Sequence, residues 1–314
     1  MHVRRNAREV AVLAPAKINL FLEVLAKRTD GYHEIETLLL PISVFDGLTF
    51  RPSEQQRIVL ECRLVAGDVA RIANFDRSSP AAHELHSSEI PQGPENLVWK
   101  AAALLQQRAA VAQGAHICLL KRIPAAAGLG GASSDAAAAL LAANLGWNLG
   151  WSTEHLRELA SELGSDIPFF LAGGAGLGRG RGETIEKVRA MRLNVVVVKP
   201  PVGLCTPHVY RRCQAASNPR TAAAASRHLA SGPVALLAGE LHNQLEPAAA
   251  GLTPWIERLR DRFSTQGFYG HRMSGSGSSY FGICRSRKHG RRVAAILRAQ
   301  SLGSVMLTET ASNR

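Results

Sequence analysis

Cysteine is scarce in this sequence and forms no recognisable pattern. The five cysteines include no Cys-x-x-Cys pair and show no regular spacing. The sequence therefore predicts neither a disulfide framework nor a zinc site. We expect reduced thiols and a cytoplasmic location.

Long hydrophobic runs are also missing. The most apolar segments, residues 136–143 and 195–198, are far shorter than the about 20 residues of a membrane-spanning helix. The apolar run 10–14, which follows the basic first residues, is too short for the core of a signal peptide and ends at Pro15. We expect no secretion signal and no membrane partner.

Acidic residues are too few to balance the basic ones. The 25 Asp and Glu residues face 37 Lys and Arg residues, which gives a formal net charge of +12. Such an excess can serve nucleic-acid binding, but the arginines are scattered along the chain and form no stripe. We therefore predict a generally basic, solvated surface and no nucleic-acid partner, with an RNA-binding module as the alternative.

The length predicts two domains, because 314 residues, 46% of them hydrophobic, are many for one ordinary domain. We place the boundary near residue 185, which gives domains 1–185 and 186–314.

Strand-like patterns cover 10–25 (as two short runs around Pro15), 34–50, 58–65, 116–123, 195–198 and the strand-turn-strand unit 270–284. Helical patterns begin at 96 and cover about 133–145, 153–163, 253–263 and 291–300, and we expect 66–94 to be irregular. The mixture predicts the α+β class.

One glycine-rich segment is the strongest local signal. It reads Pro124-Ala-Ala-Ala-Gly-Leu-Gly-Gly-Ala-Ser-Ser-Asp135, and it joins a predicted strand to a predicted helix. Free N–H groups at a helix start favour a phosphate, and glycines let the backbone approach it. Ser133 and Ser134 would either cap this helix or contact the phosphate and its Mg²⁺.

Two better-known glycine loops do not fit this segment. A P-loop requires a Gly-Lys pair, and none occurs in the chain. A dinucleotide fingerprint requires a third glycine where Ser133 stands. The segment must bind its phosphate in another way.

The segment resembles the ATP-binding motif of the GHMP kinases, the superfamily of galactokinase, homoserine kinase and mevalonate kinase. The first motif, Pro15-Ala-Lys-Ile-Asn-Leu20, and the third, Ser274-Gly-Ser-Gly-Ser-Ser279, resemble two further motifs of that superfamily in the same order. The resemblance implies a two-domain fold. Its N-terminal domain would resemble ribosomal protein S5, and its C-terminal domain would be a ferredoxin-like α/β sandwich.

Further segments resemble one family of this superfamily, the 4-diphosphocytidyl-2-C-methyl-D-erythritol kinases. They are Asp30-Gly-Tyr-His33, Gly164-Ser-Asp-Ile-Pro-Phe-Phe170, Gly180-Arg-Gly-Glu183 and Pro200-Pro-Val-Gly-Leu-Cys-Thr206. The resemblance implies transfer of the γ-phosphoryl group of ATP to the C2 hydroxyl of the methylerythritol unit, in the non-mevalonate isoprenoid pathway. A GHMP kinase for mevalonate-type or homoserine-type acceptors is the alternative.

The same resemblance assigns roles to residues. Asp166 would be the general base and Lys17 the cation near the phosphates, hydrogen-bonded to Asp166. The substrate-binding residues would be Asn19, Tyr32, His33, Thr206 and Tyr210. The ATP-binding residues would be Pro124, Ala126, Ala127, Gly128, Leu129, Gly130, Gly131, Ala132, Ser133 and Ser134, with Asn96 and Lys100 near the adenine unless they only belong to an amphipathic helix.

Cofactors and partners follow from this assignment. No dedicated metal site is expected, so that Mg²⁺ would arrive with the nucleotide. The partners would be ATP and the cytidine-linked substrate, and the chain would be a monomer or a weak homodimer. Ala132 stands where many relatives carry glycine, and the segment Leu241-His-Asn-Gln-Leu-Glu246 carries Gln244 where the family has Asp, so the role of that segment stays open.

Overall fold

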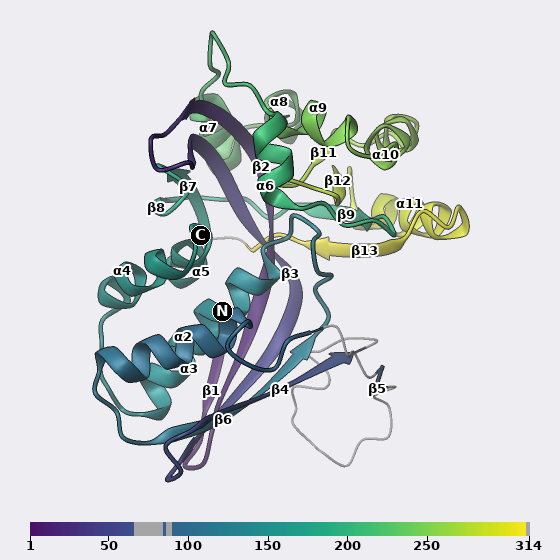
Figure 1. Cartoon of the computed structure of the whole chain (residues 1–314). Helices are drawn as coiled ribbons and strands as arrows, with labels where there is room; N and C mark the ends of the chain where they lie inside the picture. Colours follow the sequence, from purple (N-terminus) through teal and green to yellow (C-terminus); the bar gives the residue numbers. More distant parts are fainter. Residues whose placement is uncertain (66–83, 86–89, 312–314) are drawn as a thin grey trace. The chain divides into compact units, whose positions relative to one another are not determined.

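The computed structural model of the chain describes residues 1–65, 84–85 and 90–311 (Figure 1). Most of the predicted irregular segment 66–94 lies outside the described residues. The chain forms two compact units, each assembled from several segments. Unit 1 consists of Met1–Ala16, Val44–Ile123 and Gly130–Gly173, and unit 2 of Lys17–Ser43, Pro124–Leu129 and Gly174–Arg314. The predicted domain boundary near residue 185 stays a prediction.

Unit 1 combines strands with four helices in its described residues. Its strands belong to a sheet of order β1-β2-β3-β6-β4-β5, in which β6 pairs antiparallel with β3 and parallel with β4. Helix α3 is buried almost throughout because alanine and leucine fill it, and it packs against α2, α4 and α5. The elements are β1 (His2–Arg5), β2 (Val10–Lys27), β3 (His33–Ser53), β4 (Ile58–Val65), β5 (Glu84–Leu85), α2 (Leu97–Arg108), β6 (Gly114–Lys121), α3 (Gly131–Gly146), α4 (Thr153–Leu163) and α5 (Ile167–Ala172).

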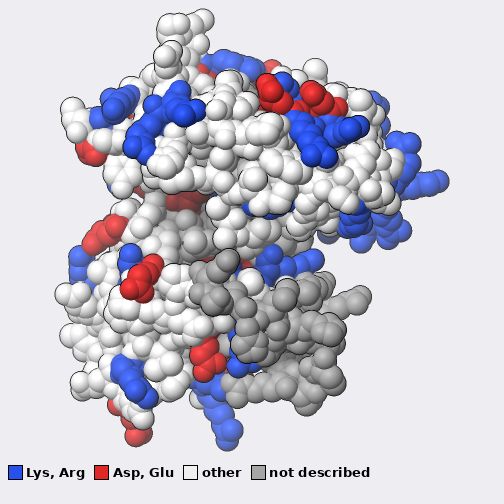
Figure 2. Space-filling view, turned by 45° about the vertical axis from the view of Figure 1, so that its right-hand side comes forward, with Lys and Arg blue, Asp and Glu red and all other residues white. Residues whose placement is uncertain are grey.

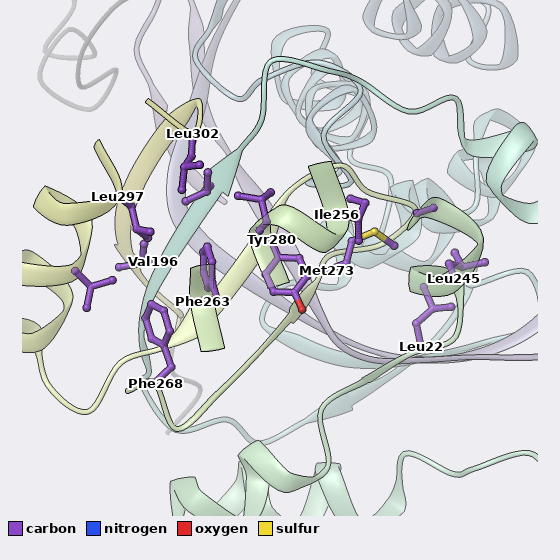
Figure 3. Close-up of a cluster of buried hydrophobic side chains, with 14 of the residues drawn as sticks. Leu22, Val196, Leu245, Ile256, Phe263, Phe268, Met273, Tyr280, Leu297 and Leu302 are labelled. Carbon is purple, nitrogen blue, oxygen red and sulfur yellow. The ribbon is translucent and has the colours of Figure 1, made fainter. Parts of the chain in front are cut away.

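Unit 2 holds the later half of β2, the first half of β3 and a separate antiparallel sheet of order β11-β12-β9-β13. A core of apolar side chains, including Val196, Phe263 and Tyr280, packs against this sheet (Figure 3). The remaining strands are β7 (Ala175–Arg179), β8 (Thr184–Val188), β9 (Asn194–Lys199), β10 (His242–Asn243), β11 (Gly270–Met273), β12 (Tyr280–Ile283) and β13 (Ser304–Glu309). The helices are α6 (Thr206–Arg212), α7 (Ala223–Ser231), α8 (Val234–Gly239), α9 (Leu245–Ala250), α10 (Trp255–Ser264) and α11 (Arg287–Ala299).

The α+β class is confirmed, but one predicted pair of strands and the starts of two predicted helices differ from the structure. The region 10–25 is one strand and not two, with Pro15 between the stretch that pairs with β1 and the stretch that pairs with β10. A proline is tolerated where the ladder needs no N–H. Helix α3 begins earlier, at Gly131, because the left-handed Gly130 is its N-cap, and α11 begins at Arg287 because Ser286 caps it.

The surface carries basic and acidic side chains together. On the face shown in Figure 2, Lys and Arg occur at several separate places with Asp and Glu among them. The described residues of this face therefore form no continuous basic stripe of the kind that tracks a nucleic-acid backbone.

Within the described ranges, none of the helices combines the length and the hydrophobicity that crossing a membrane requires.

Candidate active site

The three motifs found in the sequence meet within unit 2. The N–H of Lys17, in the first motif, donates to the carbonyl of Leu129 in the glycine turn at 2.9 Å. The hydroxyl of Ser274, in the third motif, donates to the carbonyl of Gly128 at 3.0 Å. The N–H of Ser279 donates to Ala127 O at 3.1 Å. Segments far apart in the sequence therefore form one hydrogen-bonded group.

Two glycines of the turn are required by close packing. Gly128 has φ +71°, and a Cβ there would stand 2.1 Å from the carbonyl oxygen of Ser274. In unit 1, a Cβ on Gly131 would stand 2.9 Å from Cγ2 of Ile123 and 3.3 Å from Nζ of Lys121. At each of these two positions, only glycine leaves room for the neighbouring atoms of its own unit.

The start of α3, in unit 1, has the features of an anion-binding helix terminus. The N-cap is Gly130, which has no side chain to cap the helix. The hydroxyl of Ser134 is fully buried and has no hydrogen-bond partner in the described part of the chain. Ser133 is half-buried and Ala132 exposed. A helix start that its own side chains leave uncapped favours a phosphate.

Lys17 is held by a short relay of side chains in unit 2. Its ammonium donates to Oδ1 of Asn19 at 2.7 Å, although only 4% of the residue is exposed. Asn19 in turn donates through Nδ2 to Oγ1 of Thr37 at 2.8 Å, and that hydroxyl donates to Phe21 O at 2.8 Å. Asn19 therefore fixes the position of Lys17, and its predicted contact with the substrate stays a prediction.

Asp166 occupies the N-cap position of the short helix α5 in unit 1, a helix that the sequence patterns did not predict. Its side chain is half-buried and makes no capping hydrogen bond to α5. A simple capping role therefore does not account for this aspartate. Its role as a base and its hydrogen bond to Lys17 stay predictions.

Two of the residues predicted to bind cytidine, His33 and Tyr210, contact each other in unit 2. The ring of His33, at the start of β3, lies 5.2 Å from the ring of Tyr210 in α6, with an angle of 35° between the planes. Burial lowers the pKa of His33, and the charge of Lys27 lowers it further. Tyr32 is 53% exposed, and the guanidinium of Arg181 lies 4.9 Å from the centre of its ring.

Helix α6 links this aromatic pair to the third motif. Thr206, the first residue of α6, shares a hydrogen bond of 2.8 Å between its hydroxyl and that of Ser276. Tyr210 lies one turn further along the same helix. One short helix thus contacts both the glycine motif and the ring of His33.

Asn96 and Lys100 have ordinary structural positions. Asn96 caps α2 by accepting the N–H of Val98 at 2.9 Å, and its Nδ2 donates to Pro91 O at 2.7 Å. Lys100 is exposed on α2. Their place near an adenine stays a prediction.

The sequence patterns missed a buried ionic cluster of unit 1. The ammonium of Lys121 lies between a carboxylate oxygen of Asp46 and Oδ2 of Asp135, the latter at 2.6 Å. Asp46 also accepts the N–H groups of Arg122 at 2.5 Å and Ile123 at 2.8 Å. The cluster therefore ties together the strand before the glycine turn and the helix after it.

The charges of this cluster shift its pKa values. Burial raises the pKa of Asp135 well above its usual range, although the charge of Lys121 opposes the shift. Burial alone would lower the pKa of Lys121, but the negative charges of Asp135 and Asp46 outweigh the effect of burial and raise this pKa. Two carboxylates share one ammonium, so the lysine stays charged.

Comparison with known proteins identifies the family. Residues 96–174 match the family model of the GHMP kinases N terminal domain, and residues 222–301 that of the GHMP kinases C terminal. A 4-diphosphocytidyl-2-C-methyl-D-erythritol kinase of Pelotomaculum thermopropionicum is 40% identical over 97% of this chain and 99% of that protein. The chain belongs to the 4-diphosphocytidyl-2-C-methyl-D-erythritol kinase family. The resemblance seen in the sequence is thereby confirmed.

Solved structures agree with this assignment. A crystal structure of 4-(cytidine 5'-diphospho)-2C-methyl-D-erythritol kinase superposes with a TM-score of 0.74 at 34% identity and covers 96% of this chain and 100% of that one. A homoserine kinase from Cytophaga hutchinsonii reaches a TM-score of 0.71 at 19% identity, over 100% of this chain and 98% of that one. The second similarity shows the shared GHMP fold alone. The chain is an ATP-dependent small-molecule kinase by family.

Proposed function

We propose that this protein transfers the γ-phosphoryl group of ATP to the C2 hydroxyl of 4-diphosphocytidyl-2-C-methyl-D-erythritol, giving the 2-phosphate and ADP. The observation that carries the proposal is the link through α6 between the His33 and Tyr210 rings and the third glycine motif. In this proposal the two rings bind the nucleobase, the glycine motif contacts phosphate, and α6 connects them. Relatives that bear this activity in their names support the same assignment.

Phosphoryl transfer of this kind needs positioning and charge neutralisation more than covalent chemistry. Lys17, fixed by Asn19, supplies the positive charge that the γ-phosphate requires in the transition state. Asp166 accepts the proton of the C2 hydroxyl as that oxygen attacks phosphorus. The oxygen between the β- and γ-phosphates leaves with its electron pair, so ADP is released.

The nucleotide phosphates are expected on the glycine turn from Pro124 to Ser134. The uncapped start of α3 offers N–H donors, and the buried Ser134 hydroxyl is an oxygen without a partner in the described structure. No three His, Cys, Asp or Glu side chains of the described residues group as metal ligands. We expect Mg²⁺ to arrive with ATP, where it would neutralise phosphate charge, and Ser134 would provide it an oxygen.

Cytosine recognition is assigned to three residues. The ring of Tyr210 provides a stacking surface, and Tyr32 provides a second one with Arg181 on its ring. Stacking alone tolerates any base, so the choice of cytosine falls to His33, whose neutral ring both donates and accepts a hydrogen bond. A cytoplasmic location and a monomer or weak homodimer complete the proposal.

A coupled ADP-release assay tests the function directly. The purified protein is given ATP with 4-diphosphocytidyl-2-C-methyl-D-erythritol, mevalonate or homoserine as acceptor. We expect turnover with the cytidine-linked acceptor and background rates with the other two. Faster turnover with mevalonate or homoserine would replace the proposal by that activity.

A further inference from the structure

The segment Leu241–Glu246, whose role the sequence left open, adjoins the third glycine motif. Asn243 is buried on β10, and its Nδ2 donates to Gly275 O at 2.8 Å and to Met273 O at 2.8 Å. One amide group therefore holds the chain on both sides of Ser274. Because the two carbonyls accept from a single NH₂ group, their spacing is set by the geometry of one side chain.

Gly275, held in this way, packs directly on the catalytic cation that we propose. A Cβ at Gly275 would stand 3.1 Å from Nζ of Lys17 and 3.3 Å from Oδ1 of Asn19. The backbone at this position is therefore one wall of the space that the ammonium occupies. A shift of this wall would change where Lys17 stands.

The position of Asn243 is itself tied to Lys17 through the sheet. Strand β10 runs parallel to β2, and Asn243 is in register with Leu22. Lys17 and Asn19 lie earlier on that same strand. Lys17 is thus connected to Asn243 in two ways. One connection runs along β2 to its partner strand β10, and the other runs through Gly275, which accepts from the Asn243 amide and packs on Lys17.

We propose that Asn243 is a positioning residue for the phosphoryl transfer, which fixes Gly275 against Lys17 and thereby sets where the ammonium meets the γ-phosphate. The inference rests on the proposed function, because it takes Lys17 as the cation of that reaction. Its effect is on kcat more than on affinity, because Ser274 still holds the glycine turn through Gly128 when the amide is lost.

The sharpest variant is Asn243→Asp. It keeps Oδ1, which accepts the N–H of Leu245 at 3.0 Å at the start of α9, but it loses both donors and sets a carboxylate against two carbonyl oxygens. Gln244→Glu makes the same chemical change one residue away. The glutamate of this variant still accepts the Val24 N–H. It loses only the hydrogen bond that Gln244 donates to Gln214 O, away from the glycine motif.

Steady-state kinetics and thermal unfolding are measured for both variants. We expect Asn243→Asp to lower kcat roughly 10- to 100-fold, as misplacements of about 1 Å do, with KM for ATP and for the acceptor changed less than about threefold. Gln244→Glu keeps kcat within about twofold. Equal kcat losses in the two variants, or a loss of Tm in Asn243→Asp with kcat intact, would overturn the proposal.

A second measurement does not depend on turnover. Amide hydrogen exchange of the third motif should quicken in Asn243→Asp and not in Gln244→Glu, because the amides of Ser274 and Gly277 donate to carbonyls of the same motif, those of Ser279 and Ser274, whose position Asn243 fixes. If the wild-type protein fails to phosphorylate the cytidine-linked acceptor, the proposed function fails, whereas unchanged exchange contradicts the inference itself. Should Asn243→Asp not be recovered folded, Asn243→Ser, which keeps one donor, must show a smaller kcat loss of the same kind.

Discussion

The imidazole of His33 lies 5.2 Å from the ring of Tyr210, centre to centre, with the planes tilted by 35°. Burial keeps the pKa of this imidazole below its ordinary value, so the ring is neutral at pH 7. A neutral ring can accept from the cytosine amino group, whereas a protonated ring offers only donors. With the proposed role of His33 in binding cytosine, we therefore predict that the affinity for the substrate depends on pH.

We expect the KM for the cytidine-linked substrate to be flat near neutral pH and to rise at acidic pH, below the ordinary histidine pKa, as His33 gains a proton. The KM for ATP should not follow this rise. His33→Gln keeps a hydrogen-bond donor and a hydrogen-bond acceptor but does not titrate. In this variant the KM for the cytidine-linked substrate should no longer rise at acidic pH. An unchanged acidic rise in that variant would assign the titration to another group.

Tyr210→Ala should raise the KM for the cytidine-linked substrate about 5- to 150-fold, because base stacking contributes about 1–3 kcal/mol per base. The KM for ATP should change little. Tyr269→Ala removes an exposed ring that contacts Arg285 and serves as the control, with both KM values unchanged. Equal rises in both KM values would remove Tyr210 from the cytidine site.

Asp166→Asn should lower kcat about 100- to 10,000-fold while nucleotide and acceptor affinities persist, because an amide cannot take the hydroxyl proton. Isothermal titration measures the affinities, and the ADP-release assay measures kcat. The control is Glu158→Gln, which neutralises an exposed carboxylate on α4. Near-normal turnover in Asp166→Asn would exclude this residue as the base.

Gly128→Ala and Gly150→Ala separate crowding from backbone strain. Both glycines have similar positive φ, +71° and +69°, but a Cβ at Gly150 meets nothing within 4 Å, whereas one at Gly128 meets Ser274 O at 2.1 Å. Gly150→Ala should lower the free energy of unfolding by about 1–2 kcal/mol, because it adds only backbone strain. Gly128→Ala should lower the free energy of unfolding, measured in urea, by clearly more, and it should also raise the KM for ATP. Equal losses of unfolding free energy in the two variants would contradict the close packing at Gly128.

Lys121→Met should destabilise the protein by about 3–5 kcal/mol, because it leaves the buried carboxylates of Asp46 and Asp135 without their cation. Urea unfolding near pH 7 measures the loss. Lys187→Met, at an exposed position of β8, should change stability by less than about 0.5 kcal/mol. A loss below about 1 kcal/mol in Lys121→Met would mean that the cluster contributes little.

Elements with strong local signals could be predicted from the sequence. Helix α4 was predicted with its bounds, since Ser152 caps it by accepting the His155 N–H and Gly164 ends it. The motifs around Lys17 and Gly128 were also evident. The short helices α6 and α9, of 7 and 6 residues, are too brief for a periodic pattern to appear.

Contacts between distant residues could not be predicted in this way. Lys121 and Asp46 are 75 residues apart, and Asn243 and Gly275 are 32 apart. No local spacing signals such pairs, because only the folded sheet brings them together. The motifs therefore pointed to the groups that we propose to react, while buried contacts such as Asn243 with Gly275 became visible only in the structure.

The interleaving of the two units bears on how the chain folds during synthesis. Every segment of unit 1 has been made once Gly173 has emerged, whereas unit 2 still awaits most of its residues. Leu22 and Val24 are synthesised early, yet their core partners include Phe263 and Tyr280, close to the other end of the chain. A nascent or truncated polypeptide ending near residue 185 would leave these side chains uncovered and prone to aggregation until the last part of unit 2 has been synthesised.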